Sequence, residues 1–426
     1  MSVYLYELPT TGALSFSDFC TDASTEKLYT SHIAEATQSR ANLRAVLKES
    51  KRTQDGEKDY LKLVKILDDY LPRLRGVMVC VARNEIELKS EPVFSWRTTL
   101  SANLFNTSPR QSFPSLHADY AYSLLTHAFA LSNLAKSKVT ALGAYELDRA
   151  ISDTERKAKE TQLTVAADLL CRASGMFSYI SETVLVDWES ASPGPAFAKP
   201  PDVSREVNNA LAKSALADAQ TLAIRKLLSK SAYDSNVAPG PPLPKSHPSP
   251  ALLAKLHLEC AALYSSARAL AGEITADLRR HLGDAAAFHG ALARKWLGVD
   301  AGEGDRGGDA VGFLVWARKE LEELKGRKSE LESVSVFLKH YKKANDSLHF
   351  QPVPPQGELQ ARIPAGRLAL AAKAFIPPQP AFGPGSLEDV RRRAEALELD
   401  GDGNADESSR EARSASGTYA GAGSYF

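Results

Sequence analysis

The chain has 426 residues, and its 52 lysines and arginines are balanced by 52 aspartates and glutamates, so its formal net charge is zero. This balance argues against a nucleic-acid-binding protein, because such binding depends on an excess of basic side chains. Apolar residues make up 43% of the chain and charged residues 24%, which is typical of a soluble globular protein.

We find no targeting signal in the sequence. The start lacks a basic region followed by an apolar one, and no window of about 18 apolar residues is long enough to span a membrane. We expect no lipid anchor, because residue 2 is Ser and not the Gly of a myristoylation motif, and the last residues contain no cysteine for prenylation. The four cysteines (Cys20, Cys80, Cys171 and Cys260) form no CxxC pair and are predicted to be reduced, buried thiols. We therefore expect a cytoplasmic protein that reaches membranes only indirectly, through partners.

Apolar residues at helical spacing dominate the chain after a short N-terminal strand. Val3 and Leu5 indicate the strand, and Pro9 and Gly12 end it. Helices are predicted over residues 28–49, 58–71, 116–135, 153–188, 203–230, 251–297, 311–345 and 366–375.

Prolines and glycines separate these helices. Pro72 is expected to end the second helix, since proline lacks the N–H that a helix interior needs. Residues 92–114, which contain strand-like Phe94 and Trp96, are predicted to connect the second and third helices. The Pro- or Gly-rich residues 191–201, 238–250 and 298–309 are predicted to form further loops.

These patterns predict a predominantly all-α protein of long antiparallel helices, with only a small sheet near the N-terminus. Residues 1–385 are expected to form this helical domain. The tail, residues 386–426, holds one charged helical stretch followed by Gly, Ser and acidic residues, and almost nothing apolar follows Leu399. Because such a segment buries too little apolar surface to offset its ordering entropy, it is predicted to be disordered.

Two motif-like strings are interpreted as solvated segments. Residues 302–307 match the letters of the dinucleotide fingerprint, but they follow a predicted helix, and Glu303 and Asp305 would repel a pyrophosphate. Residues 400–411 place oxygen ligands at calcium-loop positions, but Ala405 stands where the sharp turn requires glycine.

The sequence supports neither catalysis nor metal binding. His281 and His289 lie on one predicted helix, too far apart for one ion, and are predicted to be surface histidines. No GxSxG motif, P-loop or paired Cys/His signature is present. We therefore predict a non-enzymatic protein without metal or cofactor. A helical enzyme would need a cleft with titratable groups of perturbed pKa, and the sequence nominates none.

Five strings resemble the Bro-one domain, the ALIX-like helical module of ESCRT-associated proteins. They occur in the family's order: Phe-Ser-Trp-Arg at residues 94–97, Ala-Ser-Gly and Glu-Thr-Val-Leu within 173–185, Ala-Asp-Ala-Gln at 217–220, Ala-Leu-Leu-Ala-Lys-Leu at 251–256, and the string 345–354. Residues 348–354 and 364–367 resemble the family's fungal members that act in alkaline ambient-pH signalling. We expect no long coiled arm after the domain, in contrast to ALIX.

The resemblance implies a banana-shaped domain with a solenoid-like (TPR-like) core and a groove for the amphipathic C-terminal helix of the ESCRT-III polymer subunit. Such a helix inserts apolar anchors about one turn apart. The family's two aliphatic groove residues correspond to Leu252 and Leu256. Its groove Phe corresponds to Ala223, so Ile224 or Leu227 is expected to fill the gap. Without the resemblance, the apolar neighbours of Leu252 and Leu256 would indicate core residues.

The implied function is that of an adaptor that promotes proteolytic activation of a zinc-finger transcription factor in fungal alkaline-pH signalling. Its implied partners are the ESCRT-III helix and other components of the pH-signalling complex, not nucleic acid. Recruitment from the cytoplasm to endosomal or plasma-membrane ESCRT assemblies is expected. The alternative is a general ESCRT adaptor in endosomal cargo sorting, without a pH role.

Overall fold

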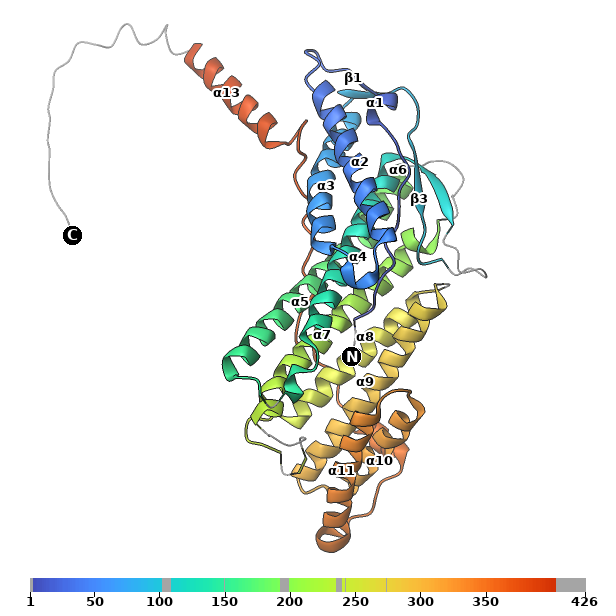
Figure 1. The fold of residues 1–426 in the computed structure, drawn as a ribbon, viewed down its shortest axis with the longest axis vertical. Coiled ribbons are helices and arrows are strands. Elements are labelled where there is room, and N and C mark those ends of the chain that lie inside the picture. The colour runs from blue at the N-terminus through green and yellow to red at the C-terminus, as the bar shows by residue number, and fades with distance from the viewer. Residues whose placement is uncertain are drawn as a thin grey trace, which may run out of the picture.

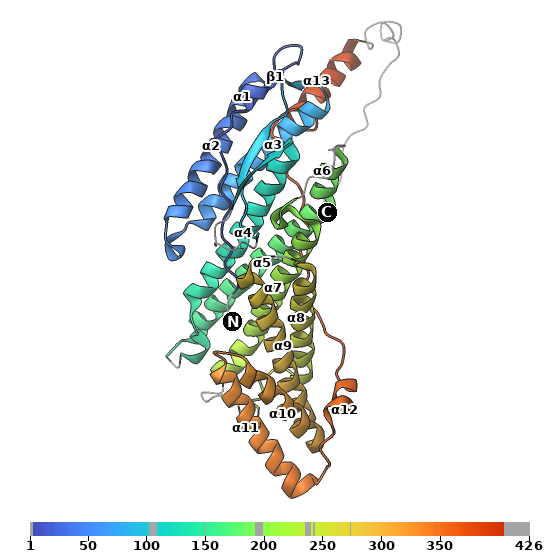
Figure 2. The same cartoon turned by 90° about the vertical axis from the view of Figure 1, so that its right-hand side faces the viewer.

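The computed structural model describes residues 3–101, 109–148, 150–191, 199–234, 240–241, 243–272 and 274–403. These residues form an elongated stack of mainly antiparallel helices (Figure 1). The amino-terminal helices occupy one end of the stack, and α10 and α11 occupy the other, as Figure 2 also shows. The predicted, predominantly all-α fold class is confirmed.

The helices and strands of the amino-terminal end are short, apart from α2 and α3. They are α1 (Phe16–Phe19), β1 (Cys20–Asp22), α2 (Thr30–Arg52), η1 (Asp55–Glu57), α3 (Tyr60–Ala82), β2 (Ile86–Leu88), β3 (Val93–Arg97) and β4 (Arg110–Pro114).

Long helices form the rest of the stack. They and the short turns between them are α4 (Leu116–Leu142), η2 (Tyr145–Leu147), α5 (Asp153–Tyr179), the π-helix η3 (Ile180–Val184), α6 (Leu185–Ala191), η4 (Pro201–Val203), α7 (Arg205–Asp234), α8 (Pro250–Leu270), α9 (Ala276–Glu303), α10 (Gly307–Glu323), α11 (Lys328–Ala344), the π-helix η5 (Asn345–His349), α12 (Gln356–Ala361) and α13 (Leu387–Gly403).

Two small antiparallel sheets pack against the amino-terminal end. β1 pairs with β2, and β3 pairs with β4 in a register that sets Phe94 opposite Phe113. The N-terminal segment adds one bridge, from Thr11 to Trp96, but residues 3–10 form no strand, so the strand predicted at Val3 and Leu5 is wrong. Phe94 and Trp96 are fully buried, so β3 contributes its apolar face to the core.

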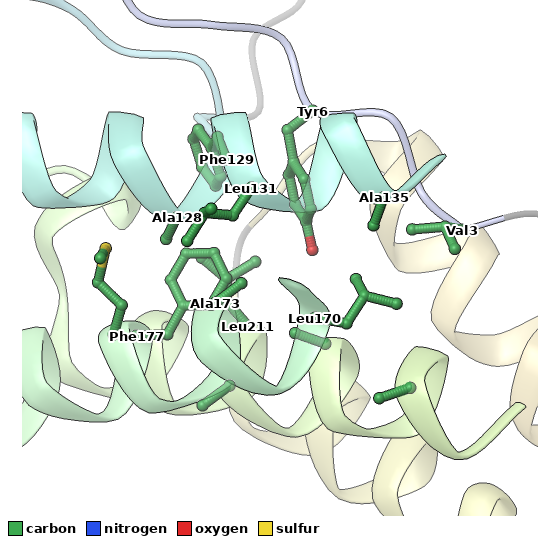
Figure 3. Close-up of a cluster of buried hydrophobic side chains, with 14 of the residues drawn as sticks. Val3, Tyr6, Ala128, Phe129, Leu131, Ala135, Leu170, Ala173, Phe177 and Leu211 are labelled. Atoms are coloured by element: carbon green, nitrogen blue, oxygen red, sulfur yellow. The ribbon is translucent and has the colours of Figure 1, made fainter. Parts of the chain in front are cut away.

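α4 is the central helix of the core, and most of its length is buried between α3, α5 and the β3–β4 sheet. The ring of Tyr6, from the N-terminal segment, stacks on Phe129 with 4.6 Å between centroids (Figure 3). The ring centroid of Phe177 of α5 lies 5.9 Å from that of Phe129 and 6.4 Å from that of Tyr6. Burying a side chain of this kind stabilises the fold by about 1.5–3 kcal/mol. The N-terminal segment is therefore part of the core.

A buried ion pair connects α2 with α4. The carboxylate of Asp119 accepts hydrogen bonds from Arg40 Nε at 3.1 Å and Nη2 at 3.0 Å, and from Trp96 Nε1 at 2.8 Å. The Tyr70 hydroxyl donates a further bond to it, and Arg40 Nη1 donates to the Gly12 carbonyl at 2.9 Å. Both charges are thus compensated by several partners, which a buried ion pair requires.

Pro72 does not end a helix, contrary to the prediction. α3 continues through it to Ala82 because its apolar stripe extends to Leu74 and Val77, which are fully buried. The Pro72 carbonyl accepts a bond of 2.9 Å from the backbone N–H of Ala381, outside the helix. The burial of the later turns outweighs the cost of an internal proline, about 3 kcal/mol.

Two of the predicted long helices are each divided in two. The helix predicted over residues 251–297 breaks at Gly272, and that over residues 311–345 breaks at Gly326. Their φ angles are 55° and 75°, in the region that glycine adopts without steric strain. The break predicted at residues 298–309 is limited to a short turn between α9 and α10.

An extended segment, residues 363–385, runs back along the stack from α12 to α3 and is called the strap below (Figure 2). The helix predicted over residues 366–375 is therefore wrong. A Cβ atom at Gly175 of α5 would lie 1.7 Å from the carbonyl oxygen of Lys373, so only glycine admits the strap there. Phe382 is 1% exposed and anchors the strap beside α3.

The charged helical stretch predicted at the start of residues 386–426 forms α13 (Figure 1), and residues 404–426 lie outside the described residues. Its start is fixed, because Ser386 and Asp389 are buried and the Gly385 N–H donates to Asp389 at 3.0 Å. The Ser386 hydroxyl accepts from the Asp389 N–H at 3.1 Å, so this Ser-x-x-Asp sequence caps the start of the helix. Most of the calcium-like string at residues 400–411 lies outside the described residues.

Candidate helix-binding surface on α7 and α8

The four residues predicted to form the groove lie on α7 and α8, which pack against each other (Figure 1). α8 starts at Pro250, and a proline is tolerated in the first helical turn because no intrahelical bond is lost there. α8 also packs against α9. The structure thus brings the two pairs of predicted groove residues onto one pair of contacting helices.

The four residues differ in burial. Leu252 and Ala223 are half-buried, whereas Ile224 and Leu256 are each 3% exposed. Leu252 and Ala223 therefore keep surface that a partner helix could contact, while Ile224 and Leu256 lie beneath it. Leu227, the other residue considered for the gap, is 40% exposed. The assignment of these residues to a groove stays a prediction.

The strap crosses α8 beside the predicted groove. The Arg367 N–H donates to the carbonyl oxygen of Lys255 at 3.0 Å, next to Leu256 in the chain. A Cβ atom at Gly366 would lie 2.6 Å from a carboxylate oxygen of Glu259, so the strap backbone lies directly on α8. The sequence gives no signal for this contact, because it is made by backbone atoms.

Gln220 of α7 holds the next part of the strap through its side-chain amide. Its Oε1 accepts from the N–H groups of Ala369 at 2.8 Å and Leu370 at 3.0 Å, and its Nε2 donates to the Leu370 carbonyl at 2.5 Å. Gln220 is 1% exposed and precedes Ala223 by about one helical turn. The strap is therefore fixed beside the predicted groove on both helices.

Buried polar side chains lie between α7, α8 and α9. The Tyr264 hydroxyl donates to Asp218 at 2.5 Å, and the Nδ1 atoms of His257 and His289 lie 2.9 Å apart, so one donates and the other accepts. Burial raises the pKa of Asp218 to about 7 and lowers the pKa of His257 to about 3. These histidines are therefore neutral near pH 7, and they connect the three helices by hydrogen bonds.

The prediction that His281 and His289 are surface histidines is wrong for His289, which is fully buried. Its ring is paired with His257, and its Nε2 lies 3.2 Å from the Thr221 hydroxyl, so both ring nitrogens have partners. Burial lowers its pKa, which favours the neutral ring. A lone histidine in a sequence does not reveal such partners.

A cavity of about 150 Å³ lies beside these polar groups, and Asp218, His281 and Arg327 are among its lining residues. It is smaller than the roughly 300–1,000 Å³ typical of ligand pockets. Within the part of the chain that the structure describes, no group of three His, Cys, Asp or Glu side chains is placed to hold a metal ion. No helix in that part is long and apolar enough to cross a membrane.

A long helical stack that carries a strap across its central helices matches a known domain class. The model of the BRO1-like domain matches residues 21–381, and the chain belongs to this family. Along its full length it is similar to the pH-response regulator protein palC of Cryptococcus neoformans var. neoformans serotype D (strain B-3501A), with 34% identity covering 100% of both chains. The palC protein of Yarrowia lipolytica (strain CLIB 122 / E 150) is 23% identical, over 88% of this chain and 94% of that protein.

The solved structure of ALIX in complex with the SIVmac239 PYKEVTEDL late domain shares the fold. It has a TM-score of 0.65 and 17% identity, covering 94% of this chain and 54% of that one, so this chain spans about half of its length. The structure of the ALIX BRO1–CHMP4C complex has a TM-score of 0.62 and 18% identity, covering 90% of this chain and 98% of that one.

These comparisons confirm the predicted membership of the Bro-one family and the predicted resemblance to its fungal pH-response members. The four cysteines are buried and unpaired in disulfides, also as predicted.

Proposed function

We propose that this protein is a non-enzymatic adaptor of fungal alkaline-pH signalling that binds the amphipathic C-terminal helix of the ESCRT-III polymer subunit on α7 and α8. The full-length similarity to palC proteins is the observation that carries this proposal. The fold shared with the ALIX BRO1–CHMP4C complex supports an ESCRT-III partner. The half-buried Leu252 on α8 supports the position of the surface.

The surface is tested by Leu252→Asp in the full-length chain, with binding of the labelled ESCRT-III helix followed by fluorescence anisotropy. An anchor side chain in such an interface commonly contributes about 2 kcal/mol, so its loss should weaken binding about thirtyfold. Leu61→Asp is the matched control, because Leu61 lies on α3 and is 49% exposed. Unchanged binding by a folded Leu252→Asp variant would remove this residue from the surface.

Leu256 distinguishes a groove anchor from a core residue. Because Leu256 is 3% exposed, Leu256→Asp should lower the melting temperature strongly, since it places a charge in the packed interior. Leu252→Asp should leave the melting temperature close to that of the wild type. Circular dichroism melts of both variants separate lost binding from lost folding.

We further propose that this adaptor promotes proteolytic activation of a zinc-finger transcription factor. In a fungal strain lacking the protein, processing of the factor after a shift to alkaline pH should fail and should return with the wild type but not with Leu252→Asp. The alternative, a general ESCRT adaptor in endosomal cargo sorting, is favoured if processing is normal and a membrane cargo accumulates instead. We propose that the protein is cytoplasmic and is recruited to endosomal or plasma-membrane ESCRT assemblies.

A further inference from the structure

The β3–β4 register places two arginines directly opposite each other. Arg97 of β3 pairs with Arg110 of β4 at the end of the small sheet. Like charges in directly opposed positions of an antiparallel pair destabilise it. The repulsion between Arg97 and Arg110 therefore destabilises this end of the sheet.

A third arginine, Arg44 of α2, lies close to this pair. The pKa of Arg110 is lowered by burial and by the neighbouring charges of Arg97 and Arg44. Arg110 is held in place, because its Nη1 donates to the Ser95 carbonyl at 3.1 Å and its Nη2 donates to the Thr10 hydroxyl at 3.0 Å. Three guanidinium groups from three separate elements are thus gathered at one place.

The charges of this cluster are only partly compensated. Arg97 forms an ion pair with Glu7, whereas Arg44 and Arg110 form no ion pair within the described residues. The Arg44 Nε atom is buried and has no hydrogen-bond partner there. Arg40, one turn earlier on the same helix, is by contrast paired with the Asp119 carboxylate through its Nε and Nη2 atoms. Arg44 and Arg110 therefore differ from Arg40, whose charge is compensated by a carboxylate of the fold.

We propose that Arg44, Arg97 and Arg110 bind a phosphate monoester group, carried either by a small soluble molecule or by a lipid headgroup. The planar guanidinium group forms two parallel bonds to phosphate oxygens, and arginine is the residue suited to such bidentate contacts. A phosphate monoester carries about −1.5 to −2 charges near pH 7, which matches the two arginines that lack an ion pair. A carboxylate supplies only one charge and compensates them less well.

Binding is measured on the full-length protein with three probes: inorganic phosphate, soluble inositol trisphosphate, and phosphatidylcholine vesicles with and without a phosphoinositide. The test variant is Arg44→Gln/Arg110→Gln. The control, Arg280→Gln/Arg318→Gln, removes the same charge from exposed arginines that pair within their own helices. Arg44→Lys/Arg110→Lys keeps the charge and removes the planar fork.

We expect the wild type and the control to bind inositol trisphosphate or the phosphoinositide vesicles, and the Gln variant to bind at least about tenfold more weakly, since charged hydrogen bonds are lost. The Lys variant should fall between them. Because the Gln variant also relieves repulsion, its ligand-free melting temperature should equal or exceed that of the wild type. Binding of the soluble probe without binding of the vesicles assigns a small molecule, and binding of the phosphoinositide vesicles assigns a lipid headgroup.

Three results would overturn the proposal. The first is that the wild type binds none of the probes. The second is that the Gln variant and the control bind equally well, which would show that charge elsewhere is responsible. The third is a lower ligand-free melting temperature of the Gln variant, which would show that the cluster stabilises the fold.

Discussion

The hydrogen bonds of Gln220 should decide how firmly the strap is held on α7. Gln220→Ala removes all three bonds between the side-chain amide and the strap residues Ala369 and Leu370. A hydrogen bond contributes about 0.5–1.5 kcal/mol net, so three contribute roughly 1.5–4.5 kcal/mol. Because the strap has further contacts on α8 and α5, this free energy should be lost mainly from local opening of the strap.

Native-state hydrogen exchange measures this opening directly. The amides of Ala369 and Leu370 donate to Gln220 in the folded protein, so their exchange in the Gln220→Ala variant should accelerate by roughly tenfold to a thousandfold. Gln38→Ala is the matched control, because Gln38 is exposed and bonds only to the neighbouring Asn42 side chain among the described residues. Amides of Ala369 and Leu370 that exchange as slowly as in the wild type would refute the role assigned to Gln220.

The same variant tests whether the strap supports the proposed groove. If the strap positions α7 and α8 for the ESCRT-III helix, Gln220→Ala should weaken helix binding even though Leu252 and Ala223 are intact. Binding equal to that of the wild type, together with a strap shown to be open by exchange, would show that the two are independent.

Three further predictions concern the body of the protein. Asp119→Ala leaves a buried guanidinium group unpaired and should lower the free energy of unfolding by about 3–5 kcal/mol in urea denaturation. Gly175→Ala should lower the free energy of unfolding by about 1–3 kcal/mol, because its Cβ would lie 1.7 Å from a strap carbonyl oxygen. Gly357→Ala is the control and should be neutral, because its Cβ would have nothing within 4 Å. Burial raises the pKa of Asp218 from 3.8 to about 7, so the folded protein binds a proton that the unfolded chain has lost. Its contribution to stability therefore falls as the pH rises from about 4 to 7, and Asp218→Asn should flatten this part of the stability profile; an unchanged profile would show that Asp218 does not titrate there.

Helices could be predicted from the sequence because their signal is local. Apolar residues at helical spacing predicted most of the helical residues, and the strand-like Phe94 and Trp96 lie in β3. The errors lie where distant contacts decide. Pro72 was predicted to end α3, but the helix continues, and Phe382 from far along the chain packs against its later turns. The splits at Gly272 and Gly326 interrupt continuous apolar patterns and could not be seen in them.

In the candidate site, too, local patterns could be predicted from the sequence, whereas contacts between distant residues could not. The helical spacing of Leu252 and Leu256 was visible in the sequence, but their different burial depends on how α8 packs against α7 and α9. Part of the strap was wrongly predicted to be a helix. The strap contacts Lys255 and Gln220 through its own backbone atoms, and such contacts leave no pattern of residue types in the sequence. His289 was assigned to the surface because its partner, His257, lies on a different helix.

Ala223 bears on how a partner helix would lie in the proposed groove. The resemblance predicts that the family's groove Phe corresponds to this alanine, and on that prediction the proposed surface lacks a ring at this point. Leu227 lies one turn further along α7, on the same side as Ala223, and is 40% exposed. An apolar side chain this exposed can replace the contact area that the missing ring would supply. We therefore infer that a bound helix contacts α7 nearer its C-terminal end than a Phe at position 223 would allow. Leu227→Asp should then weaken helix binding as much as Leu252→Asp does, and a Leu227→Asp variant that binds like the wild type would place the helix on α8 alone.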